Sequence, residues 1–480
     1  MRWALCLLMC LLMSMPLNAK PPWPAANSSP PAGWTGPVFQ PNFDFPTEPP
    51  RAERHPWHDI DFRARPEAFL NAVLSYILEG MNTTTWDGRR NTVRQWYHAP
   101  WMHEGYKGRE FIHGLTRERS SQTGELGPGQ TKCYQNWAVA IANPAGAYTY
   151  GQVWGNVSAL PDPRKSLFMR GTVFAKLLFT QAPASEVPLL KGSPEWEANI
   201  HDPSNVYPKG GADPCPNNRG RRFPQKVRLL QFDVAVRHDS SEVETGWIFG
   251  TFVYDGRIAG DIPWAKLKPV GLVWGNDPEL TDAAAAAGAK PKESIVLSDF
   301  GLGRHFGRGG RMNGPIDSQH SACLSCHSTA QYQSIARMIP TAGASEKDVL
   351  CWFRNLPHGT AFGFGADSGH ACGSSPATGV VSTDTSLQLA VGLKNYAHAT
   401  GAHLPTGAEA VSANMRDVEA QRAAGALENW RQLSVDQRAR ALERAAIDRG
   451  LLTQPIHRGD PDLTSDHIKN SEGGTQGPDG

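Results

Sequence analysis

Two cysteines and a histidine stand within five residues of one another at positions 323–327, in the sequence Cys-Leu-Ser-Cys-His. Cys323 and Cys326 are three residues apart, so on one helical turn both thiols can bond covalently to the same planar group. His327 follows directly, where its imidazole can ligate a metal at the centre of that group. With eight cysteines and 16 histidines in 480 residues, this C-x-x-C-H pattern is expected by chance roughly 0.004 times.

The motif resembles the attachment signature of the c-type cytochromes. The resemblance covers these five residues and implies one covalent haem c, with thioethers at Cys323 and Cys326 and His327 as the proximal iron ligand. Alternatives are a zinc site completed by Cys351, Cys372 and neighbouring histidines, a dithiol redox site, and a plain disulfide. A dithiol site is expected to open a helix after a strand in a βαβ pattern, which is absent around this motif.

The second axial position of such an iron has several candidates. Met338 follows His327 by eleven residues in a proline-containing loop, and an extended chain of that length spans over ~30 Å, enough to pass round a porphyrin. Met338 is therefore the predicted distal ligand, with core packing as the competing role. The other candidates are an open position, two methionines and four histidines: Met312, Met415, His320, His358, His370 and His398.

Arginines are frequent in the stretch GLGRHFGRGGRMNGP at 301–315, just before the motif. Arg304, Arg308 and Arg311 are predicted to contact haem propionates, because guanidinium pairs well with carboxylate; a solvated loop is the alternative. The charge-dense segment HGLTRERS at 113–120 is a further candidate for part of a distal pocket.

A looser resemblance concerns the residues from Gly171 to Lys176, where a strand begins GTV and has a lysine three residues later. An aromatic-rich strand and then C-x-x-C-H follow. This order is similar to that of the cytochrome P460 family. It implies a β-sheet platform, a five-coordinate haem and a cross-link from Lys176 to that haem. A solvent-facing strand lysine is the alternative.

The N-terminus has the pattern of a secretory signal peptide, predicted for residues 1–19. Arg2 precedes an apolar run that ends near Met15, shorter than the ~20 residues that span a bilayer. No later apolar segment reaches that length. The protein is therefore expected to be periplasmic or otherwise exported, soluble, and without a transmembrane segment after cleavage, which suits haem c because that group is attached outside the cytoplasm.

Cleavage would leave six cysteines, and export allows disulfides. The predicted pairs are Cys133 with Cys215 and Cys351 with Cys372. The chain has 47 basic and 46 acidic residues, a balance that argues against nucleic acid as a partner. Glycine (48), proline (38) and tryptophan (15) are abundant, which favours a loop-rich, β-containing protein.

The predicted fold class is α+β, with an antiparallel sheet in the N-terminal domain and a mainly helical haem c region after it. Periodicity predicts a helix at 66–80, strands at 172–179, 227–236 and 245–256, and a hairpin of 137–142 with 148–154. Residues 349–357, 385–399 and 433–450 are predicted helices. The predicted divisions are a signal peptide (1–19), a proline-rich linker or surface arm (20–65), an α+β domain (66–300), a haem c-binding region (301–400), a helical C-terminal segment (401–455) and a disordered tail (456–480).

These features predict an exported monohaem protein that transfers single electrons to a redox partner protein of unknown identity, with the N-terminal domain as a docking or substrate platform. The first alternative is a haem enzyme whose open iron position acts on peroxide, hydroxylamine or nitric oxide. The second is a haem-based sensing or structural protein.

Overall fold

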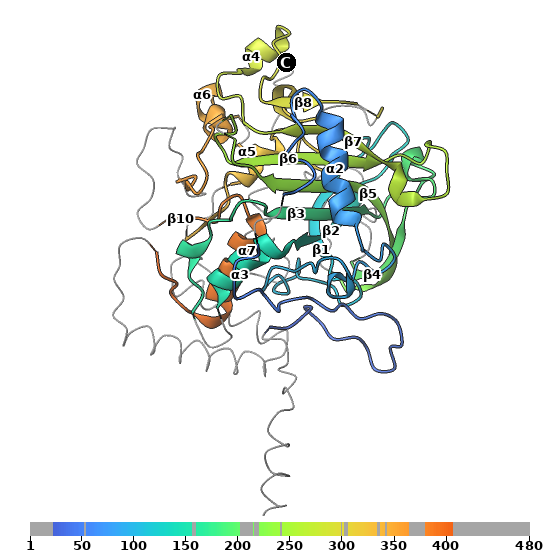
Figure 1. Cartoon of the computed structure of the whole chain (residues 1–480). Coiled ribbons are helices and arrows are strands. Elements are labelled where there is room, and N and C mark those ends of the chain that lie inside the picture. Colours follow the sequence, from blue (N-terminus) through green and yellow to red (C-terminus); the bar gives the residue numbers. More distant parts are fainter. Residues whose placement is uncertain are drawn as a thin grey trace, which may run out of the picture.

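An antiparallel sheet of eight strands forms the centre of the fold (Figure 1). The computed structural model describes residues 23–406 except 52–53, 156–159, 202–214, 216–219, 241, 299, 302–305, 334–336, 341–342 and 364–379. The strands lie in the order β1-β2-β3-β5-β6-β7-β8, and β4 pairs with the start of β5. Their bounds are β1 Thr116–Ser121, β2 Tyr134–Ala142, β3 Val173–Thr180, β4 Glu195–Ile200, β5 Phe223–Arg237, β6 Trp247–Tyr254, β7 Leu267–Val273 and β8 Ser294–Val296. The predicted α+β class with an antiparallel sheet is confirmed.

The helices are short, apart from three of 11 to 14 residues. The α-helices are α2 Pro66–Leu78, α3 Pro144–Trp154, α4 Asp282–Ala286, α5 Cys323–His327, α6 Glu346–Val349 and α7 Leu387–Thr400. Single 3-10 turns are η1 Gly88–Arg90, η2 Pro163–Lys165, η3 Pro188–Leu190, η5 Pro263–Lys266, η6 Arg308–Gly310 and η7 Leu350–Phe353. A separate two-stranded sheet pairs β9 Gln331–Tyr332 with β10 Val381–Ser382.

Helix α2 covers one face of the sheet (Figure 1). Pro66 stands at its first turn, and Phe69, Leu70 and Val73 are fully buried. These side chains pack in one core with the inward residues of β3, β5 and β6. Gly80, at φ +70°, ends the helix, because only glycine adopts a left-handed conformation there without strain. The helix predicted at 66–80 is confirmed.

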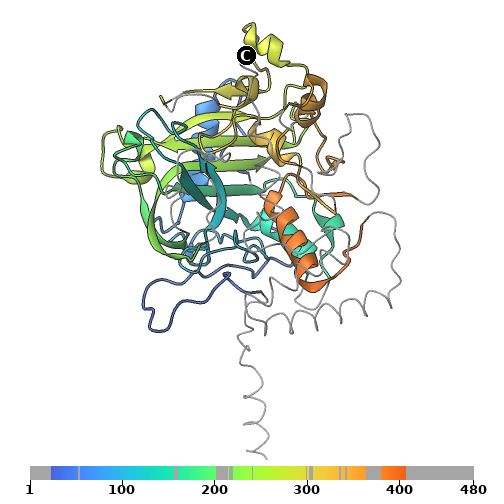
Figure 2. The same cartoon turned by 180° about the vertical axis from the view of Figure 1, so that it is seen from behind.

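Helices α3 and α7 lie on the opposite face (Figure 2). Their apolar side chains share a second core with Trp247 and Phe249 of β6 and with Leu324 of α5. That core also includes Trp23 and Leu404, so residues from the predicted arm, the α+β domain, the haem c-binding region and the start of the predicted C-terminal segment pack together. The predicted arm is anchored by buried aromatic rings, among them Trp23 and Trp57.

The predicted hairpin of 137–142 with 148–154 is wrong. Residues 137–142 lie in β2, but 148–154 belong to α3. The Asn143 side chain accepts a hydrogen bond from the Gly146 N–H at 3.1 Å, and Pro144 occupies the first turn. An N-cap followed by proline starts a helix, and this local signal outweighs the strand-like composition of the segment.

Strand alternation in 227–236 predicts that Leu230, Phe232, Val234 and Val236 lie on one face. Phe232, Val234 and Val236 do pack in one core with helix α2, but Leu230 packs in a different cluster. The pairing register shifts here: Leu178 pairs with Gln231 and the next residue, Phe179, pairs with Leu229. Leu230 is thus the extra residue of a bulge, which reverses the side-chain alternation.

Within the described part of 301–406, helices α5, α6 and α7 are separated by long loops and by β9 and β10. The predicted mainly helical character of this region is not shown. The predicted signal peptide (1–19) and tail (456–480) lie outside the described residues, as does the predicted C-terminal helical segment after residue 406. Among the helices of the described residues, none has the length and apolar character needed to cross a membrane.

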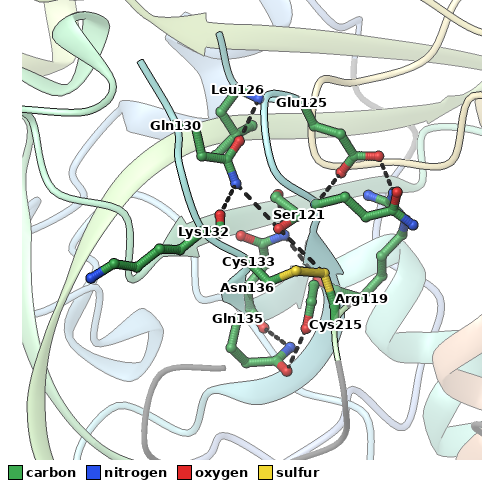
Figure 3. Close-up of a disulfide and its surroundings, with 12 residues drawn as sticks. Arg119, Ser121, Glu125, Leu126, Gln130, Lys132, Cys133, Gln135, Asn136 and Cys215 are labelled. Atoms are coloured by element: carbon green, nitrogen blue, oxygen red, sulfur yellow. Dashed lines mark hydrogen bonds and ion pairs between the residues drawn. A yellow bond between two sulfur atoms is a disulfide. The ribbon is translucent and has the colours of Figure 1, made fainter. Parts of the chain in front are cut away.

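Cys133 and Cys215 form a disulfide (Figure 3), as predicted. Beside it, Gln130 donates to the carbonyls of Ser121 and Lys132, at 3.2 and 2.8 Å. Cys351 is also disulfide-bonded, while Cys372, its predicted partner, lies outside the described residues. The Cys133–Cys215 link ties the start of β2 to the segment before β5.

Replacing Cys133 and Cys215 together with alanine is expected to lower the free energy of unfolding by about 2–4 kcal/mol, because a link between residues far apart restricts the unfolded chain. The sequence separation is 82 residues. Urea unfolding of the oxidised protein measures the loss. Each single substitution should cost about as much as the pair, since either one removes the bond. Additive losses, or no loss, would contradict a stabilising link.

Candidate functional site

Helix α5 presents the motif from a single short turn. Ser325 Oγ accepts a hydrogen bond from the Ala322 N–H at 2.8 Å, which closes the start of the helix. Leu324, fully buried, anchors it in the second core, and the Cys323 N–H donates to the Met312 carbonyl at 3.2 Å. The helix therefore holds Cys323, Cys326 and His327 at fixed positions against the sheet.

His327 is held as a neutral imidazole with one nitrogen satisfied. Its Nδ1 lies 2.8 Å from the Thr385 carbonyl oxygen; because a carbonyl only accepts, Nδ1 carries the proton. Burial lowers the pKa of His327 to about 4, and its ring lies 4.6 Å from that of Phe249. No described residue forms a hydrogen bond with Nε2. A neutral ring with Nδ1–H bonded to a carbonyl is the form in which Nε2 ligates a metal.

Cys323 and Cys326 are both unpaired thiols, whereas Cys133, Cys215 and Cys351 are disulfide-bonded. The Cys326 thiol donates to the Met338 carbonyl at 3.1 Å, and Cys323 Sγ lies 3.4 Å from Asn313 Oδ1. Burial raises the pKa of both thiols, that of Cys326 to about 12. Both are thus neutral at pH 7, which disfavours their use as redox nucleophiles.

A zinc site at the motif lacks ligands in the described residues. Cys351, one of the proposed ligands, is committed to a disulfide, and Cys372 lies outside the described residues. The described part of the chain contains no group of three or more histidine, cysteine, aspartate or glutamate side chains placed to hold a metal ion.

A polar row crosses the sheet beneath the motif. Lys176 of β3 pairs with Asp233 of β5, which pairs with Thr251 of β6, and directly paired residues share one face. Thr251 Oγ1 lies 4.0 Å from Cys323 Sγ, so this face is turned toward α5. Lys176 Nζ forms an ion pair with Glu118 Oε1 at 3.1 Å. Glu118 belongs to the charge-dense segment 113–120, so the structure brings that segment and Lys176 together beside the motif.

Asp233 and Asp317 form a carboxylate pair in this row. The Gln231 amide nitrogen lies 2.9 Å from Asp233 Oδ1 and 2.9 Å from Asp317 Oδ2, and Thr251 Oγ1 donates to Asp233 at 2.8 Å. Burial, with the negative charge of Asp317, raises the pKa of Asp233 to about 7. Burial lowers the pKa of the Lys176 ammonium, but the charges of Glu118, Asp317 and Asp233 outweigh it, so that pKa is raised. The face therefore concentrates ionisable groups.

The candidates for the distal position are spread over the fold. Met338 places its backbone carbonyl against Cys326, and its distal role stays a prediction. Met312 is fully buried in the second core. His358 Nε2 lies 2.7 Å from Asp384 Oδ2, and both its ring nitrogens also contact Arg237. His320 is half-buried before the motif and His398 lies on α7; Met415 and His370 lie outside the described residues.

The arginines before the motif have partners of their own. Arg311 is buried, and its guanidinium donates to the carbonyls of Asn276, Asp277 and Leu280 at 2.6–2.8 Å. Arg308 Nε donates to Asp282 at 2.9 Å. These bonds fix the loop that leads into α5. Arg304 lies outside the described residues, and the propionate contacts of the three arginines stay a prediction.

Sequence reasoning missed the partners of the motif that lie far along the chain. Thr385 and Asp384, more than 55 residues after His327, carry no local pattern that links them to it. Asp233 lies in the part of β5 between Arg228 and Arg237, where every other residue is uncharged. A single charged residue in that stretch is the signal that could have found it, because a carboxylate in a buried strand is costly without a role.

No protein-family model matches this chain, and comparison with curated proteins and with solved structures yields no similar protein.

Proposed function

We propose that this chain is an exported protein that carries one covalently attached haem c and transfers single electrons at it to a redox partner protein. The observation that carries the proposal is the state of His327, whose Nδ1–H is bonded to the Thr385 carbonyl at 2.8 Å while Nε2 has no described partner. The unpaired thiols one helical turn away support it. The predicted signal peptide and the disulfide between Cys133 and Cys215 are compatible with export.

In this proposal Cys323 and Cys326 hold the porphyrin by thioether bonds and His327 Nε2 ligates the iron. The group supplies a one-electron couple when bound. Phe249 and the polar row of Lys176, Asp233 and Thr251 then line the region beside the motif. The predicted helical segment at 401–455, the distal ligand Met338 and the propionate contacts belong to the same proposal, with the sheet as a docking or substrate platform.

The proposal is tested by the intact mass of protein produced with a haem-maturation system. We expect wild type to gain the mass of one haem, because both thiols are unpaired and lie on one helical turn. Cys326→Ala and Cys323→Ala should each lose one thioether bond, and the double variant should carry no covalent haem. Elemental analysis should find one iron per chain.

A matched control is Ser328→Ala, which removes a side chain that donates to the Leu324 carbonyl at the end of the same helix. This variant should retain the haem. Colourless wild-type protein, zinc in place of iron, or a disulfide between Cys323 and Cys326 in the mature protein would overturn the proposal.

A second candidate function is favoured by the charged row beside the motif. An electron-transfer site needs no buried ionisable groups, but Lys176, Glu118 and Asp233 lie there with shifted or paired charges. A haem enzyme with an open iron position, acting on peroxide, hydroxylamine or nitric oxide, would use such groups to bind and to move protons. In the P460-like form of this alternative, Lys176 is the residue cross-linked to the haem.

The visible spectrum separates the two functions. A low-spin spectrum that is unchanged by added peroxide or nitric oxide supports electron transfer, and its loss in Met338→Ala would assign the distal ligand. A high-spin spectrum that shifts with these ligands supports the enzyme. A mass that differs from the value expected for haem attached by two thioether bonds alone would support the cross-link, provided that Lys176→Arg does not show this difference.

A further inference from the structure

The turn that contacts His327 contains two consecutive residues in the left-handed region. Asp384 has φ +47° and Thr385 has φ +66°, and neither is glycine. Such residues cost of order 1–3 kcal/mol each and persist only where the surroundings fix them. The Ser386 N–H closes the turn on the Thr383 carbonyl at 2.9 Å, and the Thr383 N–H donates to the Ala330 carbonyl at 3.1 Å. The turn is thus tied to the chain directly after α5.

The Asp384 carboxylate supplies the main anchor of this turn. It is 1% exposed and accepts three hydrogen bonds from three separate segments. The Phe168 N–H donates to Oδ2 at 2.8 Å, the Trp247 indole N–H donates to Oδ1 at 3.1 Å, and His358 Nε2 lies 2.7 Å from Oδ2. Trp247 is itself fully buried in the second core, so the anchor is fixed to the sheet.

Arg237 supports this anchor through the His358 ring. Its Nη2 lies 3.0 Å from His358 Nδ1. The Arg237 Nε lies 2.9 Å from His358 Nε2, the nitrogen that also faces Asp384, so Arg237 contacts both ring nitrogens of His358. The Arg237 cation also offsets the buried charge of Asp384, since a buried carboxylate is stable only when it is paired or hydrogen-bonded.

We infer that Asp384 is a positioning residue for His327, holding the left-handed turn that aims the Thr385 carbonyl at Nδ1. The inference rests on the proposed function, because it concerns the histidine assigned as iron ligand. Partners of a ligand histidine fix its tautomer and raise its basicity. A more basic ligand stabilises the oxidised metal, so the Asp384 anchor holds the reduction potential down.

The test compares Asp384→Asn and Asp384→Gly in the haem-loaded protein. Asparagine keeps the shape of the side chain, but its amide has only one acceptor oxygen, so it cannot accept from both the Phe168 N–H and the Trp247 indole. Glycine adopts φ +47° readily but has no side chain to anchor. We expect both to raise the midpoint potential and to lower the iron–histidine stretching frequency of the reduced protein, more so for glycine. His358→Ala, which removes one of the three donors, should give a smaller shift in the same direction.

Asp277→Asn is the matched control. Asp277 also has a left-handed backbone, at φ +48°, and its buried carboxylate accepts the N–H groups of Lys292 and Glu293 at 2.6 and 3.2 Å. It anchors a turn in the same way, but it does not contact His327. Its substitution should lower stability without moving either spectroscopic value. Equal shifts in the control would reduce Asp384 to a structural role.

A second measurement uses the haem-free protein. Nitrogen NMR of the His327 ring, assigned against His327→Ala, should show a single tautomer protonated at Nδ1 in wild type and a mixture of tautomers in Asp384→Gly. Thioether mass is measured for every variant. Absence of haem from wild type would refute the proposed function; haem-loaded variants with wild-type potential, frequency and tautomer would refute the role of Asp384 alone.

Discussion

Replacing His327 with alanine is expected to leave the haem attached but to remove its proximal ligand. Both thioether bonds come from Cys323 and Cys326, so the intact mass should still include one haem. The spin state and visible spectrum should change, and electron exchange with a small reductant should slow. Mutation of residues that only support a ligand histidine lowers activity by roughly 10–100-fold. Loss of the ligand itself should therefore slow electron exchange by more than this factor. Stopped-flow reduction and the visible spectrum measure both effects.

His55→Ala provides the control for loss of a buried imidazole. Burial lowers the pKa of His55 to about 4, as for His327, and its ring stacks on Trp57 at 4.6 Å. Its removal should cost packing energy and leave the spectrum unchanged. Added imidazole should restore the wild-type spectrum of His327→Ala but have no effect on His55→Ala. A wild-type spectrum in His327→Ala without added imidazole would contradict the assignment of His327.

Much of the fold follows from patterns that are local in sequence. Helix α2 was predictable because its apolar residues recur at helical spacing between Pro66 and Gly80, and β3, β5 and β6 because of their β-branched and aromatic runs. The strand predicted at 148–154 is wrong because the N-cap formed by Asn143 starts a helix there, whatever the composition of the segment. The bulge at Leu230 had no visible signal, since it depends on the register between β3 and β5.

In the candidate site, too, local sequence patterns predicted some residues and could not predict others. Cys323, Cys326 and His327 lie on one helical turn, so their spacing alone predicted a common site. Thr385, Asp384 and Asp233 join it only through tertiary packing, across sequence distances that local patterns do not report. Their roles depend on a left-handed turn and on cross-strand pairing. These are properties of the folded chain rather than of any short segment.

Asp233→Asn is expected to reduce the loss of stability that occurs as the pH rises from about 4 to 7. The ordinary pKa of this carboxyl is 3.8, and burial beside Asp317 raises it to about 7 in the folded protein. Between these values the folded state binds more protons than the unfolded state, so the free energy of unfolding falls with rising pH. Each pKa unit corresponds to about 1.4 kcal/mol, which gives a penalty of roughly 4 kcal/mol above pH 7. Asparagine carries no such penalty.

The measurement is urea unfolding of wild type and variant from pH 4 to 8. The slopes of the free energy of unfolding against pH are compared, rather than its absolute values, because asparagine also alters the hydrogen bonds from Gln231 and Thr251. Asp255→Asn is the control with the opposite sign. The Arg257 guanidinium lowers the pKa of Asp255, so its contribution to stability is present above pH 3.8 and is lost as the pH falls through the lowered value. Its replacement should lower stability at neutral pH and leave the slope from pH 4 to 7 unchanged. If Asp233→Asn retained the wild-type slope, the raised pKa would not belong to Asp233.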